Sequence, residues 1–328
     1  VNHLKRVAAF KNPDFYSKRA MHLSTYNVPH IISCSDVTDE YIGLPRGCED
    51  AVTDLFDENN VDYTFEDKTN EGSTIQVEFI GQLRPEQEEA VNSLIIYNNG
   101  ILHATTAFGK TITSIGLIAK RKVNTLILVH TKALLGQWKK RLQEFLTIDY
   151  KEENEPKKRG KKKAFSPFGT LDSTGNCLHG WIDIALVQSC LEDSDAGVKP
   201  FVRDYGMVIV DECHHVPAAN FEIVLRYINS KYVYGLTATP TRKDGHQPII
   251  YMQCGPIRYV ADAQQQIASQ NFERILTPRF TIFRQLNDDN NNFNALCDKL
   301  IDDEQRNNLI VTDAIAAVLQ GRTPIILS

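Results

Sequence analysis

Five short apolar runs alternate with amphipathic segments through the middle of the chain. The runs cover residues 101–105, 125–130, 182–188, 207–212 and 232–239. Between them, segments such as 110–121 and 132–146 repeat apolar residues at helical spacing. Strands that are apolar on both faces and alternate with helices are typical of a parallel sheet covered on both sides. We therefore predict an α/β domain over residues 83–275.

The first 82 residues have a different pattern, in which short apolar stretches are mixed with turn residues. Here we predict a helix over 49–56 and strands over 61–65 and 73–81. These elements make a small α+β domain, and none of its residues by itself indicates a reaction. A helix with Pro85 in its first turn, ending before Gly100, then opens the α/β domain.

Residues 276–328 begin with an extended segment, "TPRFTIFRQL", and an Asn-rich linker. A helix over 303–319 and a strand over 323–328 are predicted to follow. This pair resembles the opening of a second α/β unit.

Composition restricts the class of protein. Among the 328 residues, 42% are hydrophobic and 23% are charged, as in soluble globular proteins. No apolar run approaches the ~18 residues of a membrane span, so we expect no membrane partner and a cytoplasmic location. The seven cysteines form no C-x-x-C pair, which favours reduced thiols.

The net charge of −5 argues against a protein that coats nucleic acid by bulk charge, although a local basic groove stays compatible with it. Residues 157–163, "KKRGKKK", are either a solvated loop or a flexible contact to nucleic-acid phosphates.

The stretch "ATTAFGKT", residues 104–111, lies between a predicted strand and a predicted helix. In such a loop Gly109 permits a tight turn, and backbone N–H groups at the helix start point at phosphate oxygens. Lys110 would reach the β- and γ-phosphates of ATP, and the Thr111 hydroxyl would ligate Mg²⁺. Ala104 stands where the strict pattern has glycine.

The stretch "MVIVDECHH" places two acids at the end of an apolar strand. Asp211 would hold Mg²⁺, and Glu212 would polarise the water that attacks the γ-phosphate. His214 and His215 are poor candidates for a separate metal site, because adjacent side chains diverge. The hydroxyl residues of "GLTATPTRKDG" would lie beside these carboxylates.

Taken together, "ATTAFGKT", "LVHTKALLGQW", "IDIALVQS", "VDECHH" and "GLTATPTRKDG" resemble motifs I, Ia, Ic, II and III of superfamily 2 helicases. The chain is most similar to the XPB-like and type III restriction-like branch. The resemblance implies a RecA-like P-loop domain followed by a second RecA-like lobe. More weakly, "AAFKNPDFY" and "IGLPRGC" resemble the segment before the core in bacterial members, including those of TOTE-type systems.

The resemblance implies roles for individual residues. It assigns ATP binding to Arg84, Gln87, Phe108, Gly109, Lys110 and Thr111; catalysis to Lys110, Asp211 and Glu212; Mg²⁺ to Thr111 and Asp211; coupling between lobes to His214, Thr237 and Thr239; and nucleic-acid contact to Lys132, Gln137, Arg242 and Lys243. Trp138, the nearest aromatic residue to that track, is expected in the core rather than stacked on a base.

The function that this resemblance implies is ATP-dependent movement on nucleic acid, with DNA favoured and RNA left open. The arginines of the family's motif VI do not occur in these residues, so we expect the chain to be an incomplete piece that binds ATP and hydrolyses it poorly. Two alternatives stay open: a nucleic-acid-binding or scaffold module with a non-hydrolysing ATP site, and a double-strand translocase that does not unwind.

Overall fold

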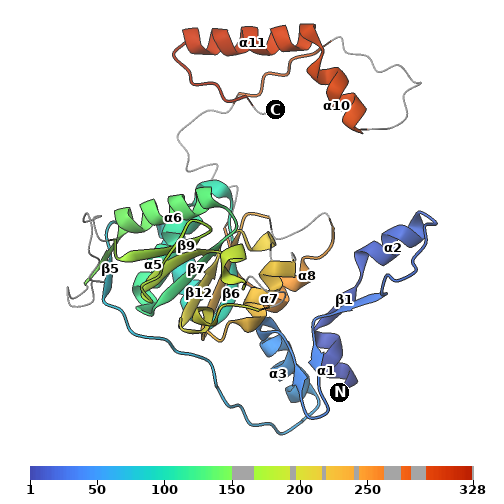
Figure 1. Cartoon of the computed structure of the whole chain (residues 1–328), viewed down its shortest axis with the longest axis vertical. Helices are drawn as coiled ribbons and strands as arrows, with labels where there is room; N and C mark the ends of the chain where they lie inside the picture. Colours follow the sequence, from blue (N-terminus) through green and yellow to red (C-terminus); the bar gives the residue numbers. More distant parts are fainter. Residues whose placement is uncertain are drawn as a thin grey trace. The chain divides into compact units, whose positions relative to one another are not determined.

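The structure, a computed structural model, describes residues 1–149, 166–192, 197–215, 219–239, 244–261, 275–281 and 293–326. The chain divides into two compact units, residues 1–270 and residues 271–328 (Figure 1). Within the described residues, no helix is long and apolar enough to cross a membrane. All seven cysteines lie within these ranges and are free.

An eight-stranded sheet is the centre of the first unit. From one edge to the other it contains β10 (Gly175–Cys177), β9 (Phe168–Asp172), β11 (Ile182–Leu186), β7 (Thr125–Val129), β12 (Met207–Val210), β13 (Tyr232–Thr237), β6 (Asn99–His103) and β14 (Ile257–Val260). All neighbouring pairs are parallel except β10 with β9. The predicted α/β class is therefore confirmed, and the carboxyl ends of the parallel strands lie along one edge of the sheet.

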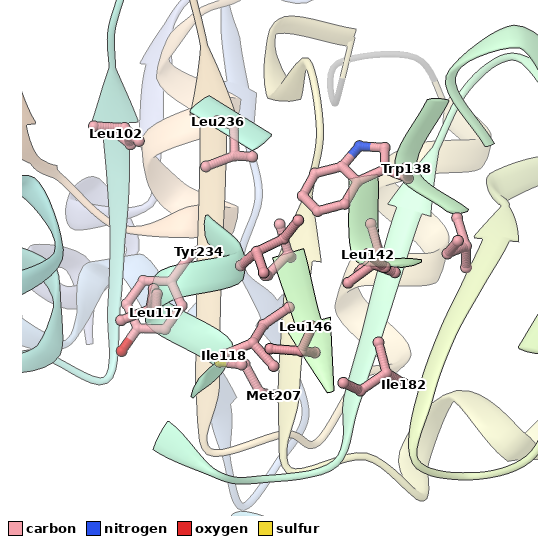
Figure 2. Packing of buried hydrophobic residues seen from close by; sticks show 14 of the residues in the cluster. Leu102, Leu117, Ile118, Trp138, Leu142, Leu146, Ile182, Met207, Tyr234 and Leu236 are labelled. Atoms are coloured by element: carbon pink, nitrogen blue, oxygen red, sulfur yellow. The ribbon is translucent and has the colours of Figure 1, made fainter. Parts of the chain in front are cut away.

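Helices cover both faces of this sheet (Figure 1). One face packs against α4 (Pro85–Ile95), α5 (Lys110–Arg121) and α6 (Lys132–Phe145), and the other against α7 (Ala219–Tyr227) and α8 (Pro248–Cys254). Successive residues of a strand enter opposite cores: Leu126 belongs to the α7–α8 side and Ile127 to the α4–α6 side. Figure 2 shows the second of these cores, with Trp138 and Leu142 of α6 packed beside the strands.

The amino-terminal residues form small elements that pack on the α7–α8 side of the sheet. They are α1 (Asn2–Val7), β1 (Ala9–Lys11), α2 (Pro13–Ala20), β2 (Ile31–Ser33), β3 (Asp36–Val37), β4 (Ile42–Gly43) and α3 (Glu49–Glu58). Arg46 connects them with the segment between α7 and β13 (Tyr232–Thr237), because its guanidinium donates to the carbonyls of Ser230 and Ile228, each at 2.7 Å. Ala8 and Cys34 belong to the same apolar core as β12.

Two strand predictions in this region need correction. Residues 61–65 form no strand; Val61 and Phe65 are exposed, and in the described part of the chain no strand pairs with them. Within the predicted strand 73–81 only β5 (Val77–Phe79) forms, and it pairs antiparallel with β8 (Leu146–Ile148), directly after α6. β5 thus joins the α/β core, and the expected domain boundary at residue 82 stays a prediction.

In the second unit, helices α10 (Phe293–Ile301) and α11 (Glu304–Leu319) are described. The helix predicted over 303–319 is confirmed. Asp303 caps it by accepting a hydrogen bond from the Arg306 N–H. The predicted strand at 323–328 is wrong for its described part, 323–326, which is irregular and exposed. The assignment of this unit to a second lobe stays a prediction.

Candidate nucleotide-binding site

The loop after β6 has the backbone geometry of a phosphate-binding loop. It leaves the strand at Ala104, passes through a short 3-10 helix (Thr106–Phe108) and enters α5 at Lys110. Gly109 has φ 85° and ψ 42°, a left-handed conformation that side chains disfavour. A Cβ at Gly109 would also lie 2.7 Å from Gln87 Nε2. At the start of α5, as in any helix, the first N–H groups have no carbonyl partner within the helix, and they face this loop.

Two polar residues at the start of α4 hold this loop in place. The side chains of Arg84 and Gln87 both donate to the Phe108 carbonyl, Gln87 Nε2 at 2.8 Å. Gln87 Oε1 in turn accepts from the Arg84 N–H at 3.0 Å. The Phe108 ring is fully buried, so its expected contact with ATP is restricted to its backbone atoms. Arg84 and Gln87 therefore lie beside the loop, and their role as readers of a bound base stays a prediction.

Lys110 supplies a buried positive charge at the centre of the site. The residue is only 6% exposed. Its Nζ donates to the Ala104 carbonyl at 3.2 Å and lies 3.8 Å from Glu212 Oε1. A buried ammonium is costly unless anions or acceptors surround it, so this environment suits a group that meets phosphate oxygens. Thr111 follows it in the first turn of α5.

Asp211 begins the loop after β12 and is 5% exposed. Its two carboxylate oxygens have different partners: Oδ2 accepts from Trp138 Nε1 at 2.7 Å, and Oδ1 accepts from the Glu212 N–H at 3.0 Å. Burial raises the pKa of the Asp211 carboxyl, and the hydrogen bond from Trp138 opposes that rise.

This donor set fits a magnesium ion bound together with nucleotide. Burial disfavours the charged form of a carboxylate, and a nearby cation stabilises that form. Among the described residues, no cluster of three or more His, Cys, Asp or Glu side chains is arranged to hold a metal by itself. Magnesium typically uses one or two protein oxygens and completes its shell with phosphate oxygens and water, which matches Asp211 with Thr111.

Glu212 has a backbone conformation that is unusual for its residue type. Its φ of 48° lies in the left-handed region, which costs free energy and is often found at functional sites. Its Oε2 lies 3.2 Å from His214 Nδ1, and that nitrogen lies 3.3 Å from Thr237 Oγ1. Thr237 Oγ1 also accepts from the Thr239 N–H at 3.1 Å. The structure thus brings the four residues into one polar chain.

That chain reaches the phosphate loop through the sheet. The Thr237 carbonyl accepts from the Ala104 N–H at 3.0 Å, so the ends of β13 and β6 are bonded where the loop begins. A change in the position of Thr237 would therefore alter both its contact with His214, which lies beside Glu212, and its hydrogen bond to the start of the loop.

The residues expected to contact nucleic acid are only partly described. Lys132 and Gln137 lie on the exposed side of α6, and Lys132 Nζ is 3.9 Å from Asp172 Oδ2. Arg242 and Lys243 lie outside the described residues, as does the basic run 157–163. Contact of these residues with nucleic acid stays a prediction.

Comparison with known proteins identifies the family. Residues 80–242, about half of the chain, match the family model "Type III restriction enzyme, res subunit". A putative helicase, 109L, of invertebrate iridescent virus 3 is 31% identical over 189 residues, which cover 56% of this chain and 53% of that protein. The "DNA 3'-5' translocase XPB2" of Sulfurisphaera tokodaii is 30% identical over 178 residues, which cover 54% of this chain and 35% of that protein. The chain belongs to the superfamily 2 helicases, in the XPB-like and type III restriction-like branch.

The fold agrees with that helicase family. The crystal structure of the UvsW helicase from bacteriophage T4 matches with a TM-score of 0.52 and 16% identity, covering 78% of this chain and 91% of that chain. The eight-stranded unit therefore has the RecA-like fold of these helicases. The chain spans about half or less of the length of the curated relatives named above.

One contact of this candidate site could not be found from the sequence. Trp138 is in the core, as predicted, but its N–H is also a partner of Asp211 across 73 positions of sequence. The only signal was the position of Trp138 on the helix after β7, the neighbour of β12 in the sheet. Residue spacing does not reveal which edge of an indole ring faces a carboxylate.

Proposed function

We propose that this chain is the ATP-binding part of an ATP-dependent DNA helicase or translocase. One observation carries the proposal: the buried Lys110 ammonium of the phosphate loop lies 3.8 Å from the Glu212 carboxylate, beside Asp211. A cation, a carboxylate for magnesium and a carboxylate for water then meet at one edge of the sheet, as phosphoryl transfer to water requires.

Binding of the triphosphate would use the helix start and Lys110. The free N–H groups of α5 and the lysine charge both attract phosphate oxygens. Gln87 keeps one N–H and one lone pair beyond the bonds it makes to the loop, which is the donor–acceptor pair that an adenine edge needs. Arg84 would lie on the same side.

Hydrolysis would depend on positioning and charge. Magnesium, held by Thr111 and Asp211 together with the phosphates, would neutralise charge that develops on the phosphoryl oxygens. Glu212 would orient the attacking water and accept its proton. His214 fixes Glu212 from the other side, at 3.2 Å, and would connect it with Thr237.

Nucleic acid would be held along α6, where Lys132 and Gln137 are exposed, with Arg242 and Lys243 as further contacts. Contacts of this kind bind phosphates and carry little sequence information. We propose DNA as the track because the relative from Sulfurisphaera tokodaii is named a DNA translocase.

We further propose that these 328 residues turn ATP over slowly by themselves. The side chains described around the loop come from a single α/β unit. In this reaction class an arginine from another domain or protein is worth about 10³- to 10⁵-fold in rate.

Equilibrium binding of a fluorescent ATP analogue, with and without Mg²⁺, tests the proposed site. We expect magnesium-dependent binding that weakens by about 10-fold or more in Lys110→Ala, because a charge-assisted contact to phosphate is lost. Lys120→Ala, at the exposed end of the same helix, is the matched control and should bind as the unsubstituted chain does. Equal affinity of the Lys110→Ala variant would overturn the assignment.

A further inference from the structure

Trp138 connects the helix expected to touch nucleic acid with the carboxylate expected to hold magnesium. The indole is fully buried, and its Nε1 donates to Asp211 Oδ2 at 2.7 Å. Figure 2 shows the ring packed in the apolar core, with its nitrogen at the edge turned away from Leu142. An aromatic ring without an N–H would fill similar space, so the polar contact is an addition to the packing.

The bond also fixes the orientation of the carboxylate. Asp211 Oδ1 is held by the Glu212 N–H at 3.0 Å, and Oδ2 by Trp138. Two donors on opposite oxygens restrict rotation of the carboxylate and leave lone pairs on both oxygens for a cation. Partners of this kind, one shell outside a metal, orient the ligand and strengthen metal binding.

Helix α6 has two different sides at this point. Leu135, Trp138 and Leu142 are buried at helical spacing, whereas Lys132 and Gln137 are exposed. Gln137 and Trp138 are adjacent in sequence, so a displacement of α6 at its exposed side also displaces the indole N–H. The length of the bond to Asp211 then depends on where α6 sits.

We propose that Trp138 is a positioning residue for Asp211, and that α6 passes contact with nucleic acid to the magnesium site through this hydrogen bond. The inference rests on the proposed function, since it takes Asp211 as a magnesium ligand and α6 as part of the nucleic-acid track. Trp138 is the last residue of the quoted stretch "LVHTKALLGQW", and what the inference adds is a role for its N–H and a route to Asp211.

The first test observes the indole itself in a protein that keeps Trp138. The chain has two tryptophans, so Trp181→Phe leaves Trp138 as the single source of an indole N–H resonance. We expect this resonance to shift when Mg²⁺ is added to the complex with a non-hydrolysable ATP analogue, and to shift again with duplex DNA. A resonance that stays in place during both additions would overturn the proposal.

The second test compares magnesium affinity in two matched variants, Trp138→Phe and Trp181→Phe. We expect the Mg²⁺ concentration for half-maximal nucleotide binding to rise about 10-fold in Trp138→Phe. In this variant, DNA should no longer change that Mg²⁺ concentration. Trp181→Phe should keep the original value. Equal values in both variants would overturn the inference.

Nucleotide binding at saturating Mg²⁺ separates this inference from the proposed function. If the unsubstituted chain binds no ATP analogue at all, the proposed function fails first. If it binds the analogue and Trp138 has no effect on Mg²⁺, only the role of Trp138 fails. A Trp138→Phe protein that does not fold leaves the resonance experiment as the deciding test.

Discussion

The Lys110 ammonium, at the start of α5, and the Glu212 carboxylate, just after β12, lie 3.8 Å apart. Both side chains are largely shielded from water, at 7% and 22% exposure, so the attraction between them is less screened than at the surface. The γ-phosphate of ATP would enter between them, because it needs Lys110 on one side and a water oriented by Glu212 on the other.

Replacing Glu212 by Gln separates these two roles. The amide keeps the size of the side chain but cannot take a proton, so kcat should fall by about 100-fold or more. ATP binding should persist or tighten, because the substitution removes a negative charge that competes for Lys110. Steady-state turnover and analogue binding, measured on the same preparation, check both parts. Loss of binding together with turnover would show that Glu212 does not act on water.

Asp211 should make magnesium binding sensitive to pH. Burial raises the pKa of its carboxyl, so protons compete with Mg²⁺ at a higher pH than at an ordinary aspartate of pKa ~3.9. Lowering the pH from about 8 to about 5 should therefore raise the Mg²⁺ concentration needed for half-maximal nucleotide binding.

An Asp211→Asn variant measures how much of this change comes from protonation of the nucleotide. Its Mg²⁺ requirement should be higher throughout, and should change with pH only as the free nucleotide does. The same pH profile in both proteins would contradict the role of Asp211. Because the pKa is higher in the folded chain, this group also makes unfolding less favourable as the pH falls.

Gly109→Ala should disturb the phosphate loop from the backbone. The φ of 85° disfavours any side chain, and the added Cβ would meet Gln87 Nε2 at 2.7 Å. We expect stability to fall by about 1–2 kcal/mol and ATP affinity by about 10-fold. Chemical unfolding and analogue binding measure the two effects.

Gly136→Ala is the matched control for this substitution. Gly136 lies inside α6 with nothing within 4 Å of an added Cβ, so alanine there should stabilise the chain by about 0.5–1 kcal/mol. If Gly109→Ala behaved in the same way as this control, the strained loop would not be needed for binding.

Lys132→Ala tests the proposed nucleic-acid track. If the exposed ammonium neutralises one DNA phosphate, the slope of log affinity against log salt should decrease by about 1. Affinity should fall for duplexes of unrelated sequence alike, because phosphates carry no sequence information. Lys140→Ala, on the same helix with its side chain 76% exposed, serves as the control. Equal slopes for both variants would remove Lys132 from the track.

The sequence predicted best those elements that are buried on both faces. β7 and β12 consist entirely of buried residues and were found from their apolar runs. β9, β10 and β14 were missed, because they lie toward the sheet edges and contain polar or exposed residues such as Asn176 and Arg258. Conversely, residues 61–65 alternate like a strand, but none of the described strands pairs with them.

Within the candidate site, some contacts could likewise be predicted from the sequence and others could not. Sequence order and the parallel sheet are enough to expect Lys110 and Asp211 at one edge, because both follow apolar strands. The sequence also places Thr237 beside the acidic motif, whereas the bond from Trp138 to Asp211 depends on the rotamers of residues 73 positions apart. Such contacts appear only once the side chains are packed.

The most direct test of the account is ATP turnover by this chain with and without duplex or single-stranded DNA, beside Glu212→Gln. We expect a slow rate that rises when DNA is added and disappears in the variant. A rate that does not change when DNA is added, or one that is unchanged in Glu212→Gln, would contradict the assignment of this site as the ATPase centre of a nucleic-acid motor.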